Sequence, residues 1–248
     1  MIHYHGTPMT PAADMVKAFR GRHAMVSFEH PDQLDVAAEI CQSVALDNGA
    51  FSAWRQGKQY DFDGYYAWVE NWLRHPAVDW AIIPDVIDGD EEANERLLSQ
   101  WPFGKSVGVP VWHLHEGLAR LKWLATSKWP RIALGSSGQY ADPGSGSWWA
   151  RMSEAMRVIC DDNGSPLVKL HGLRMLDPVI YAHLPFSSAD SCNVARNVGI
   201  DNAWNGTYAP RSRAMRALIM MDRIEAHASA ARWSRSSSGV QQHMELLG

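Results

Sequence analysis

The stretch WAIIPDVIDGDEEANERLLSQW, residues 80–101, predicts a buried strand followed by a helix. Its first five letters are a short apolar run ending in proline, which is typical of a buried strand. The segment from 88 onward begins with acidic residues, as a helix N-terminus favours, and becomes apolar later. We therefore expect one strand–helix unit here, with Asp85 just beyond the strand.

The same alternation extends in both directions along the chain. Seven further apolar runs have the length of a strand, and most end in polar or glycine-rich turns. They are IHYH (2–5), AMVSF (24–28), SVAL (43–46), VPVWHLH (109–115), RIALG (131–135), LVKLHG (167–172) and LPFSSA (184–189). Segments that read as helices lie between or after them, among them 62–74, 146–161 and 210–229.

Eight strands separated by helices predict parallel strands joined by crossovers. Eight is the strand count of a (β/α)8 TIM barrel, an α/β fold in which catalytic side chains lie at the C-terminal ends of the strands. We therefore expect one such barrel domain over 1–248. An arginine-rich helical segment at 205–238 is expected to belong to the same domain.

The composition is that of an ordinary globular protein, with 46% hydrophobic and 20% charged residues among 248. Its three cysteines, Cys41, Cys160 and Cys192, are widely spaced and lack CxxC spacing. Neither a disulfide framework nor a four-cysteine zinc site is therefore expected. No secretory signal or membrane span is visible, which predicts a cytoplasmic protein with no membrane partner.

The net charge of −4 argues against a surface broadly dedicated to nucleic acid. Arginines are nevertheless concentrated at 205–238, where six of them outnumber Asp222 and Glu225. A local basic face there would hold phosphates. A solvated helix face is the alternative interpretation.

Residues suited to catalysis or to ligand binding occur at the ends of the predicted strands. They are His3, His5, Asp47, Asp85, His113, His115, Gly135, Ser136, His171 and Asp190. Asp47 begins an Asn-Gly turn, so a purely structural role as a turn-former is the alternative for it. Together with Asp190 it would serve a double displacement at a sugar carbon, in which one carboxylate attacks and the other moves protons.

Several motifs resemble those of the tRNA-guanine transglycosylase (queuine tRNA-ribosyltransferase) family, a barrel family, and they occur in the family's order. LDNGAF (46–51) resembles the family's DSGGF. DSCNVARN (190–197) resembles its DCVLPTRN, and the Asp, Arg and Asn coincide. Between these, IIPDVID resembles the strand that reads the guanine edge, HLHEG the VQGG element and ALGSSG the GGL turn.

The resemblance implies that guanine in a polynucleotide is exchanged for a 7-deazaguanine through a covalent Asp–sugar intermediate. Asp190 is the implied nucleophile, and Asp47 assists base binding and proton transfer. The implied base-binding residues are Asp85, His115, Gly135, Ser136 and Phe51. The implied phosphate-binding residues are Arg196, Arg211 and Arg213.

The chain departs from the family pattern in three respects. No cysteine follows Cys192, so the family's zinc site is not expected, and no metal or other cofactor is expected. His115 replaces a glutamine, which changes the hydrogen bonds available to a base. The chain is also short, like phage-associated relatives that act on DNA. The expected partners are therefore DNA or tRNA and a 7-deazaguanine base, and family members often form homodimers.

Two other functions are compatible with parts of the sequence. The HYH pair, His3 and His5, resembles the first-strand ligands of metal-dependent, amidohydrolase-like barrel hydrolases, with His113 or His115 and Asp190 as further ligands. Against this, RIALGSSG lacks the expected sixth-strand histidine, and the fourth strand offers no lysine. The other alternative is a nucleic-acid-binding barrel without catalysis.

Overall fold

Strands and helices alternate along the residues that the computed structural model describes, which are 1–87, 89–199, 204 and 208–234. These residues form two compact units that are interleaved in the sequence. The N-terminal unit consists of Ile2–Ala81 and Asp190–His227. The central unit consists of Met1, Ile82–Ala189 and, among the described residues, 228–234.

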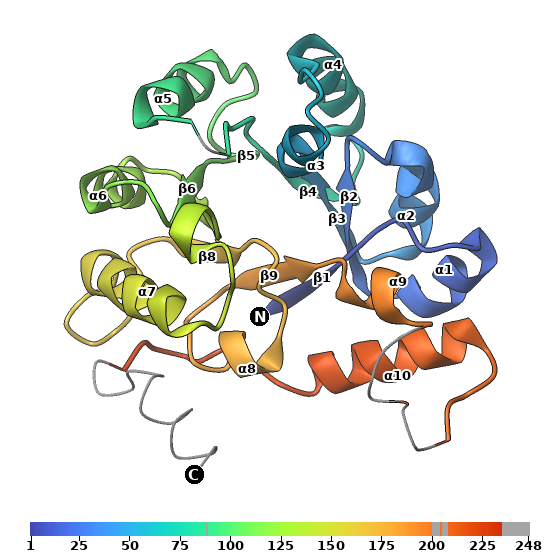
Figure 1. Ribbon diagram of the computed structural model, residues 1–248. Coiled ribbons are helices and arrows are strands. Elements are labelled where there is room, and N and C mark those ends of the chain that lie inside the picture. The colour runs from blue at the N-terminus through green and yellow to red at the C-terminus, as the bar shows by residue number, and fades with distance from the viewer. Residues whose placement is uncertain (88, 200–203, 205–207, 235–248) are drawn as a thin grey trace. The chain divides into compact units, whose positions relative to one another are not determined.

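The N-terminal unit contains four strands that follow one another in space in their sequence order. All of their pairings are parallel. The strands are β1 (Ile2–Gly6), β2 (His23–Ser27), β3 (Ser43–Asp47) and β4 (Val78–Ile82). The helices are α1 (Ala12–Phe19), η1 (Pro31–Gln33), α2 (Leu34–Ile40), α3 (Ala50–Arg55), α4 (Phe62–Trp72), α9 (Asn193–Asn197) and α10 (Arg213–Glu225). In Figure 1, β1 to β4 and the helices α1 to α4 are coloured from dark blue to teal, and α9 and α10 of the same unit are orange to red.

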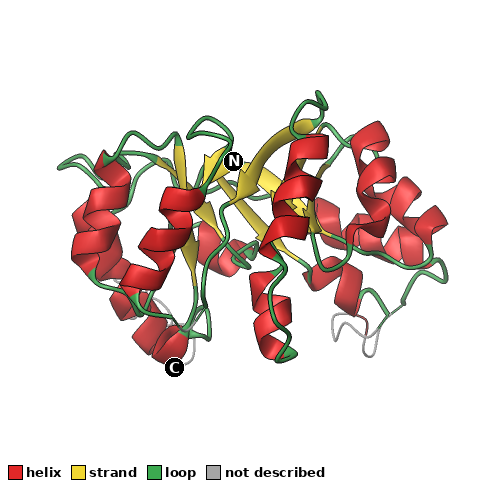
Figure 2. Cartoon of the chain, turned by 90° about the horizontal axis from the view of Figure 1, so that it is seen from above, coloured by secondary structure: helices red, strands yellow, loops and turns green. Residues whose placement is uncertain are grey.

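The central unit repeats the pattern with parallel pairings from β6 through β9. Its strands are β5 (Gly108–Val109), β6 (Val111–His113), β7 (Arg131–Gly135), β8 (Lys169–Gly172) and β9 (Ser188–Ser191), the last of which crosses the unit boundary. Its helices are α5 (Glu91–Gln100), α6 (Leu118–Thr126), η2 (Gly138–Tyr140), α7 (Gly146–Ile159) and α8 (Pro178–Tyr181). Figure 2 shows the helices in red beside the yellow strands that they connect.

The predicted α/β class is confirmed, since parallel strands alternate with helices as in a (β/α)8 TIM barrel. Every apolar run predicted as a strand overlaps an observed strand, with boundaries that differ by a few residues. The run at 109–115 is split into β5 and β6 by Pro110, which has no N–H to donate to a ladder. The carbonyl of Pro110 still accepts a hydrogen bond from Ala133 N at 2.9 Å. The expectation of a single domain stays a prediction.

Three predicted helices are confirmed, and each begins at a side chain that caps it. Asp61, Ser145 and Ser212 accept a backbone N–H at the starts of α4, α7 and α10. The arginine-rich segment at 205–238 contains α10, while its residues 205–207 and 235–238 lie outside the described part of the chain. Among the described residues, no helix has the length and apolarity to cross a membrane.

The strands of the N-terminal unit bury one face against helices. His5 points to that face, where its ring lies 6.2 Å from the ring of Phe19 in α1. Its neighbour Tyr4 points the opposite way, because side chains alternate along a strand. The hydroxyl of Tyr4 and Nδ1 of His23 both reach Ser43 Oγ, at 3.4 and 2.9 Å. We call the face that carries Tyr4, His23 and Ser43 the inner face.

The central unit has an inner face by the same reasoning. Trp112 of β6 points to the helices, since its ring lies 5.6 Å from the guanidinium of Arg151 in α7. His113, the next residue, therefore lies on the opposite face. Its register partner on β7 is Gly135. His113 and Gly135 thus end two neighbouring strands on the inner face of this unit.

Candidate functional site

Asp47, the first of the two predicted catalytic carboxylates, is the last residue of β3 in the N-terminal unit. It lies four residues after Ser43 and therefore on the inner face. Its Oδ2 accepts a hydrogen bond from Gly49 N at 3.2 Å. Gly49 has φ +76, and a Cβ there would lie 2.9 Å from Glu29 Cγ. Asp47 is thus both the acceptor that closes this turn and a carboxylate at a strand end.

Asp190, the predicted nucleophile, belongs to the same unit and lies in β9 with 6% of its surface exposed. The chain just after it runs along β1. Gly6 lies on the inner face, two residues after Tyr4, and a Cβ on it would be 2.4 Å from Cys192 Sγ. Segment 190–192 therefore lies across the C-terminal end of β1 on the inner face. Both predicted catalytic carboxylates are thus at strand ends of one unit.

Aromatic residues follow Asp47 directly. Phe51, a predicted base-binding residue, is part of α3, and its ring lies 5.7 Å from that of Trp54. Trp54 is 47% exposed, an unusual position for so large an apolar side chain. Asn48 is buried and fixes the start of the helix, since its Oδ1 accepts a hydrogen bond from Ala50 N at 2.9 Å. The turn therefore presents an aromatic pair next to the carboxylate.

The three predicted phosphate-binding arginines also belong to the N-terminal unit. Arg196 is on α9, while Arg211 and Arg213 lie at the start of α10, and all three side chains are exposed. Arg216 has a different position: its Nε donates to Val198 O at 2.8 Å and its Nη1 to Pro210 O at 2.7 Å. Arg216 thus connects α9 to α10 through hydrogen bonds. The exposed arginines, by contrast, are accessible to a phosphate group.

In the central unit, Asp85 is hydrogen-bonded to His113. His113 Nε2 lies 2.6 Å from Asp85 Oδ2, and both side chains are almost fully buried. The resemblance implies that Asp85 reads the base together with His115, Gly135, Ser136 and Phe51, and it gives no role to His113. The structure instead makes it one half of a carboxylate–imidazole pair at the end of β6.

A buried polar network supports this pair. Glu116 Oε2 accepts hydrogen bonds from His113 N at 2.8 Å and from Arg120 Nη1 at 2.7 Å. Its other oxygen, Oε1, accepts from Asn94 Nδ2 at 2.8 Å. Asn94 Oδ1 in turn accepts from Val86 N, the residue after Asp85, at 2.8 Å. The network therefore fixes the backbone beside both members of the pair.

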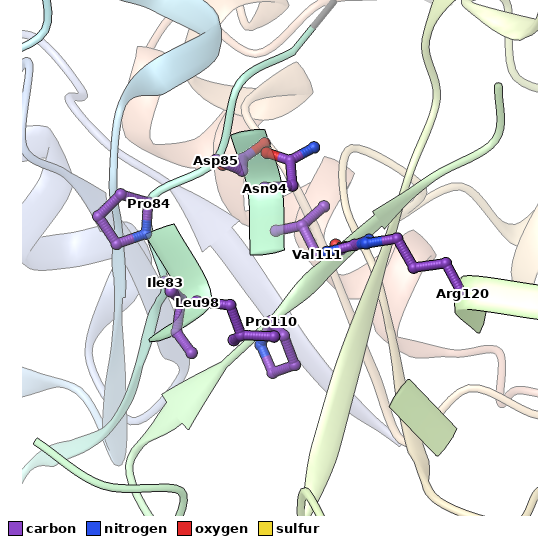
Figure 3. A pocket seen from close by; sticks show the side chains of 8 residues that line it. All are labelled: Ile83, Pro84, Asp85, Asn94, Leu98, Pro110, Val111 and Arg120. Atoms are coloured by element: carbon purple, nitrogen blue, oxygen red, sulfur yellow. Dashed lines mark hydrogen bonds between the residues drawn. The ribbon is translucent and has the colours of Figure 1, made fainter. Parts of the chain in front are cut away.

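Asp85, Asn94 and Arg120 also line a small cavity, shown in Figure 3. Its remaining walls are Ile83, Pro84, Leu98, Pro110 and Val111. Its volume of 10 Å³ is room for about one water molecule. In Figure 3 the side chains of Asp85 and Asn94 lie together at one end of the cavity. This cavity is thus too small for a base, and it lies beside the buried polar network.

His115 is also engaged in the central unit. Its Nδ1 lies 2.6 Å from Ser137 Oγ, and its ring stacks on that of His113, with centroids 5.8 Å apart and planes at 21°. Ser136 Oγ accepts a hydrogen bond from the indole Nε1 of Trp148 at 2.9 Å. The predicted base-binding residues His115, Gly135 and Ser136 therefore surround the same strand ends as His113, which the resemblance did not assign.

His3 and His5 both face the helices rather than the inner face. His3 Nε2 lies 3.1 Å from His227 O, and His5 Nε2 lies 2.8 Å from Glu225 Oε1. Burial lowers the pKa of His3, and this outweighs the opposing effects of its bond to His227 and of the charge on Glu225. A search of the described residues finds no group of three or more His, Cys, Asp or Glu side chains placed to hold a metal ion. Neither histidine is thus arranged as a metal ligand there.

Two of the cysteines, the half-buried Cys41 and the buried Cys160, are poor candidates for nucleophiles. Burial raises the pKa of the Cys41 thiol to about 12 and, with the charge of Asp161, that of Cys160 to about 11. A thiol with such a pKa is almost entirely protonated near neutrality and does not attack. The carboxylates and histidines at the strand ends are therefore better candidates than these two thiols.

Comparisons of the chain with protein-family models, with curated proteins and with solved structures find no match. The residues themselves offer two sets of groups. The N-terminal unit has two carboxylates, an aromatic pair and exposed arginines. The central unit has a buried Asp–His pair held by a polar network. These groups suit nucleophilic attack, proton transfer and the binding of a planar, hydrogen-bonding ligand.

Proposed function

We propose that the protein is a base-exchange transglycosylase that replaces guanine in a polynucleotide with a 7-deazaguanine. The observation that carries the proposal is the position of two carboxylates in the N-terminal unit: Asp47 ends β3, and Asp190 lies one residue before the end of β9. Carboxylates at the C-terminal ends of parallel strands are where catalytic groups of (β/α)8 enzymes occur. The order of motifs that resemble the guanine transglycosylases supports the same reaction.

In the proposed reaction Asp190 attacks C1′ of a guanosine nucleotide. A bond forms between its carboxylate oxygen and C1′, and the glycosidic bond breaks, with its electron pair leaving on guanine, which takes up a proton. The incoming 7-deazaguanine then loses a proton from its ring nitrogen, and that nitrogen attacks C1′ and displaces Asp190. Asp47 moves these protons as general acid and base. The exchange is balanced without an oxidant or a metal.

Base recognition is assigned to Asp85, His115, Gly135, Ser136 and Phe51. A carboxylate accepts hydrogen bonds from the guanine N1–H and 2-amino groups, and an aromatic ring stacks on the base plane. A base within a duplex first has to be flipped out of its stack.

The polynucleotide is proposed to be DNA or tRNA, held by its phosphates. Arg196, Arg211 and Arg213 are exposed in the N-terminal unit, and guanidinium groups bind phosphate oxygens in a bidentate manner. Such contacts position the substrate and do not select the base. Selection of guanine therefore falls to the base-binding residues.

The test is incorporation of radiolabelled guanine or 7-deazaguanine into guanine-containing DNA and tRNA. Wild-type protein is expected to incorporate label in the presence of a chelator, and Asp190→Ala to lose incorporation completely, because the nucleophile is gone. Asp35→Ala is the matched control, since Asp35 is an exposed carboxylate on α2 of the same unit. Incorporation by Asp190→Ala at the wild-type rate would overturn the proposal, as would wild-type protein that incorporates no label into either polymer.

A further inference from the structure

Trp54 exposes a large aromatic surface beside one of the predicted catalytic carboxylates. Its side chain is 47% exposed and lies on α3, which begins directly after the turn that Asp47 closes. Single apolar residues on a surface are common and need no explanation by themselves. The position next to Asp47, rather than the exposure alone, makes Trp54 a candidate for contact with a ligand.

The backbone that carries Trp54 is held in place. Ala53, the preceding residue, is buried. Asn48 fixes the start of the helix, since its Oδ1 accepts a hydrogen bond from Ala50 N at 2.9 Å and its carbonyl oxygen accepts one from the hydroxyl of Tyr60 at 2.7 Å. A side chain on a fixed backbone gives up less conformational freedom when a ligand covers it.

The rings of Phe51 and Trp54 are oriented so that they suit two separate bases. They lie three residues apart on one face of α3, with centroids 5.7 Å apart and planes tilted by 42°. Successive bases of a stacked strand are parallel and about 3.4 Å apart. Two bases that each stacked on one of these rings could therefore not stay stacked on each other. An exchanged base needs this arrangement, because it has to leave the stack of its neighbours.

Positive charge lies close to the exposed ring. Arg55 and Lys58 follow Trp54, and both side chains are exposed. Lys58 Nζ lies 3.5 Å from Glu29 Oε2, so this carboxylate offsets part of its charge. Arg55 is therefore the cation better suited to a phosphate. Aromatic side chains beside cations are the usual composition of a surface that binds a single strand.

We propose that Trp54 stacks on the base of the nucleotide next to the exchanged guanosine, and that Arg55 binds a phosphate of that nucleotide. This inference rests on the proposed function and adds to it a site for the flanking nucleotide. Phe51 then contacts the exchanged base, while Trp54 holds the neighbouring base apart from it. Every base has a π-face, so this site positions the strand without selecting its sequence.

The test removes the ring from the protein and the base from the substrate, singly and together. Trp54→Ala removes the ring, and Trp54→Tyr keeps an aromatic face. Trp123→Ala is the matched control, because Trp123 is also 47% exposed but lies on α6 of the central unit. The substrate is a short single-stranded oligonucleotide with one guanine, prepared as DNA and as RNA. Further versions carry an abasic site on the 5′ or the 3′ side of that guanine.

Fluorescence anisotropy measures the dissociation constants. We expect Trp54→Ala to bind the intact oligonucleotide roughly five- to hundredfold more weakly, which is the usual contribution of one stacked base. Trp54→Tyr should recover most of the affinity, and Trp123→Ala should bind like the wild type. When the stacked base itself is absent, the wild type and Trp54→Ala should bind alike, because neither can form the stack. The unfolding temperature of Trp54→Ala should stay near that of the wild type, since alanine favours an exposed helical position.

Equal binding of the intact oligonucleotide by Trp54→Ala and the wild type would overturn the role of Trp54. A loss of affinity that is the same with and without either flanking base would overturn it too. If wild-type protein meanwhile exchanges bases, the proposed function survives and this inference alone falls. If wild-type protein neither binds nor exchanges guanine in either polymer, both fall together.

Discussion

Asp47 closes a turn through Oδ2 and ends β3 on the inner face, so its two roles make different demands on its side chain. The turn needs one oxygen that accepts the hydrogen bond of Gly49. Proton transfer needs an ionisable carboxylate. Asparagine meets the first demand and fails the second.

Asp47→Asn is therefore expected to fold normally and to lose exchange. Its unfolding free energy should change by less than about 1 kcal/mol, because the amide oxygen replaces the turn acceptor. Exchange should fall by at least about a hundredfold, the usual contribution of a general acid or base. Chemical denaturation measures the unfolding free energy, and the radiolabel assay measures the rate of exchange. If Asp47→Asn exchanged bases at the normal rate, Asp47 would have a structural role in the turn and no catalytic role.

Gly6 shows how closely β1 and the segment after β9 approach within the N-terminal unit. A Cβ on Gly6 would lie 2.4 Å from Cys192 Sγ and 3.1 Å from Cys192 Cα. Gly6→Ala is expected to destabilise the protein by about 2 kcal/mol, the usual cost of overpacking. Adding Cys192→Ala removes Sγ and should restore part of that loss. Urea unfolding of Gly6→Ala and of Gly6→Ala/Cys192→Ala measures both unfolding free energies. If Gly6→Ala were as stable as the wild type, the close contact between Gly6 and Cys192 would be wrong.

Part of the central unit's polar cluster could be predicted from the sequence, because Asp85, His113 and His115 follow apolar runs that end as strands. Asn94, Glu116 and Arg120 could not. They lie on α5, on a loop and on α6, and nothing in local periodicity tells which turn of one helix faces which loop. The pairing of Asp85 with His113 escaped prediction for the same reason.

At the scale of elements, α10 is attached to the strands by charges. Glu225 accepts hydrogen bonds from His5 on β1, at 2.8 Å, and from Arg22 Nε, at 3.0 Å. Arg22 Nη2 also bonds to Asp222, one turn earlier on the helix. Burial alone would raise the pKa of Glu225, but the hydrogen bond from His5 and the charges of His5 and Arg22 outweigh it and lower the pKa below its ordinary 4.5.

This lowered pKa makes the attachment of α10 depend on pH. A carboxyl group with a lower pKa in the folded than in the unfolded state stabilises the fold above its unfolded pKa, and the contribution is lost as the pH falls through the folded pKa. Glu225→Gln is therefore expected to cost about 1–2 kcal/mol at pH 7, and the difference from wild type should shrink below about pH 4.5. Urea unfolding at several pH values checks this. A difference that is constant down to pH 3 would exclude the carboxylate as its source.

The elements themselves were more predictable than their contacts. Each strand is an apolar run bounded by turn residues, and α4, α7 and α10 begin at capping residues that can be read in the sequence. The break between β5 and β6 is the exception, because the run at 109–115 predicts one strand and Pro110 divides it into two. The missing N–H of Pro110 gives its physical reason.

At the scale of the whole molecule, the strand count and the alternation predict the fold class, but the division into two interleaved units does not follow from either. Segment 190–227 joins the N-terminal unit although it comes last but one in the sequence. Contacts between distant segments decide such a division, and composition shows no boundary there. The same long-range pairing brings Asp47 and Asp190 into one unit.

Because the net charge is −4, electrostatic binding of a polynucleotide has to come from a local group of cationic side chains. Arg196→Ala/Arg211→Ala/Arg213→Ala is expected to weaken binding of guanine-containing DNA or tRNA and to reduce its salt dependence. Each lost phosphate contact reduces the magnitude of the slope of log K against log salt by roughly 0.7–0.9. The magnitude of the slope should therefore be smaller by about 2–3 for the triple variant. Fluorescence anisotropy at several salt concentrations measures the slope.

The control for this experiment removes the same charge elsewhere. Arg20, Arg74 and Arg157 are exposed on other helical regions, so Arg20→Ala/Arg74→Ala/Arg157→Ala changes the net charge by the same three units. If long-range attraction were responsible, both triple variants would bind alike and with the same slope. A loss confined to the first variant would show that phosphates sit on α9 and the start of α10. An unchanged slope in both would place the phosphate contacts elsewhere, because counterion release follows direct contact rather than total charge.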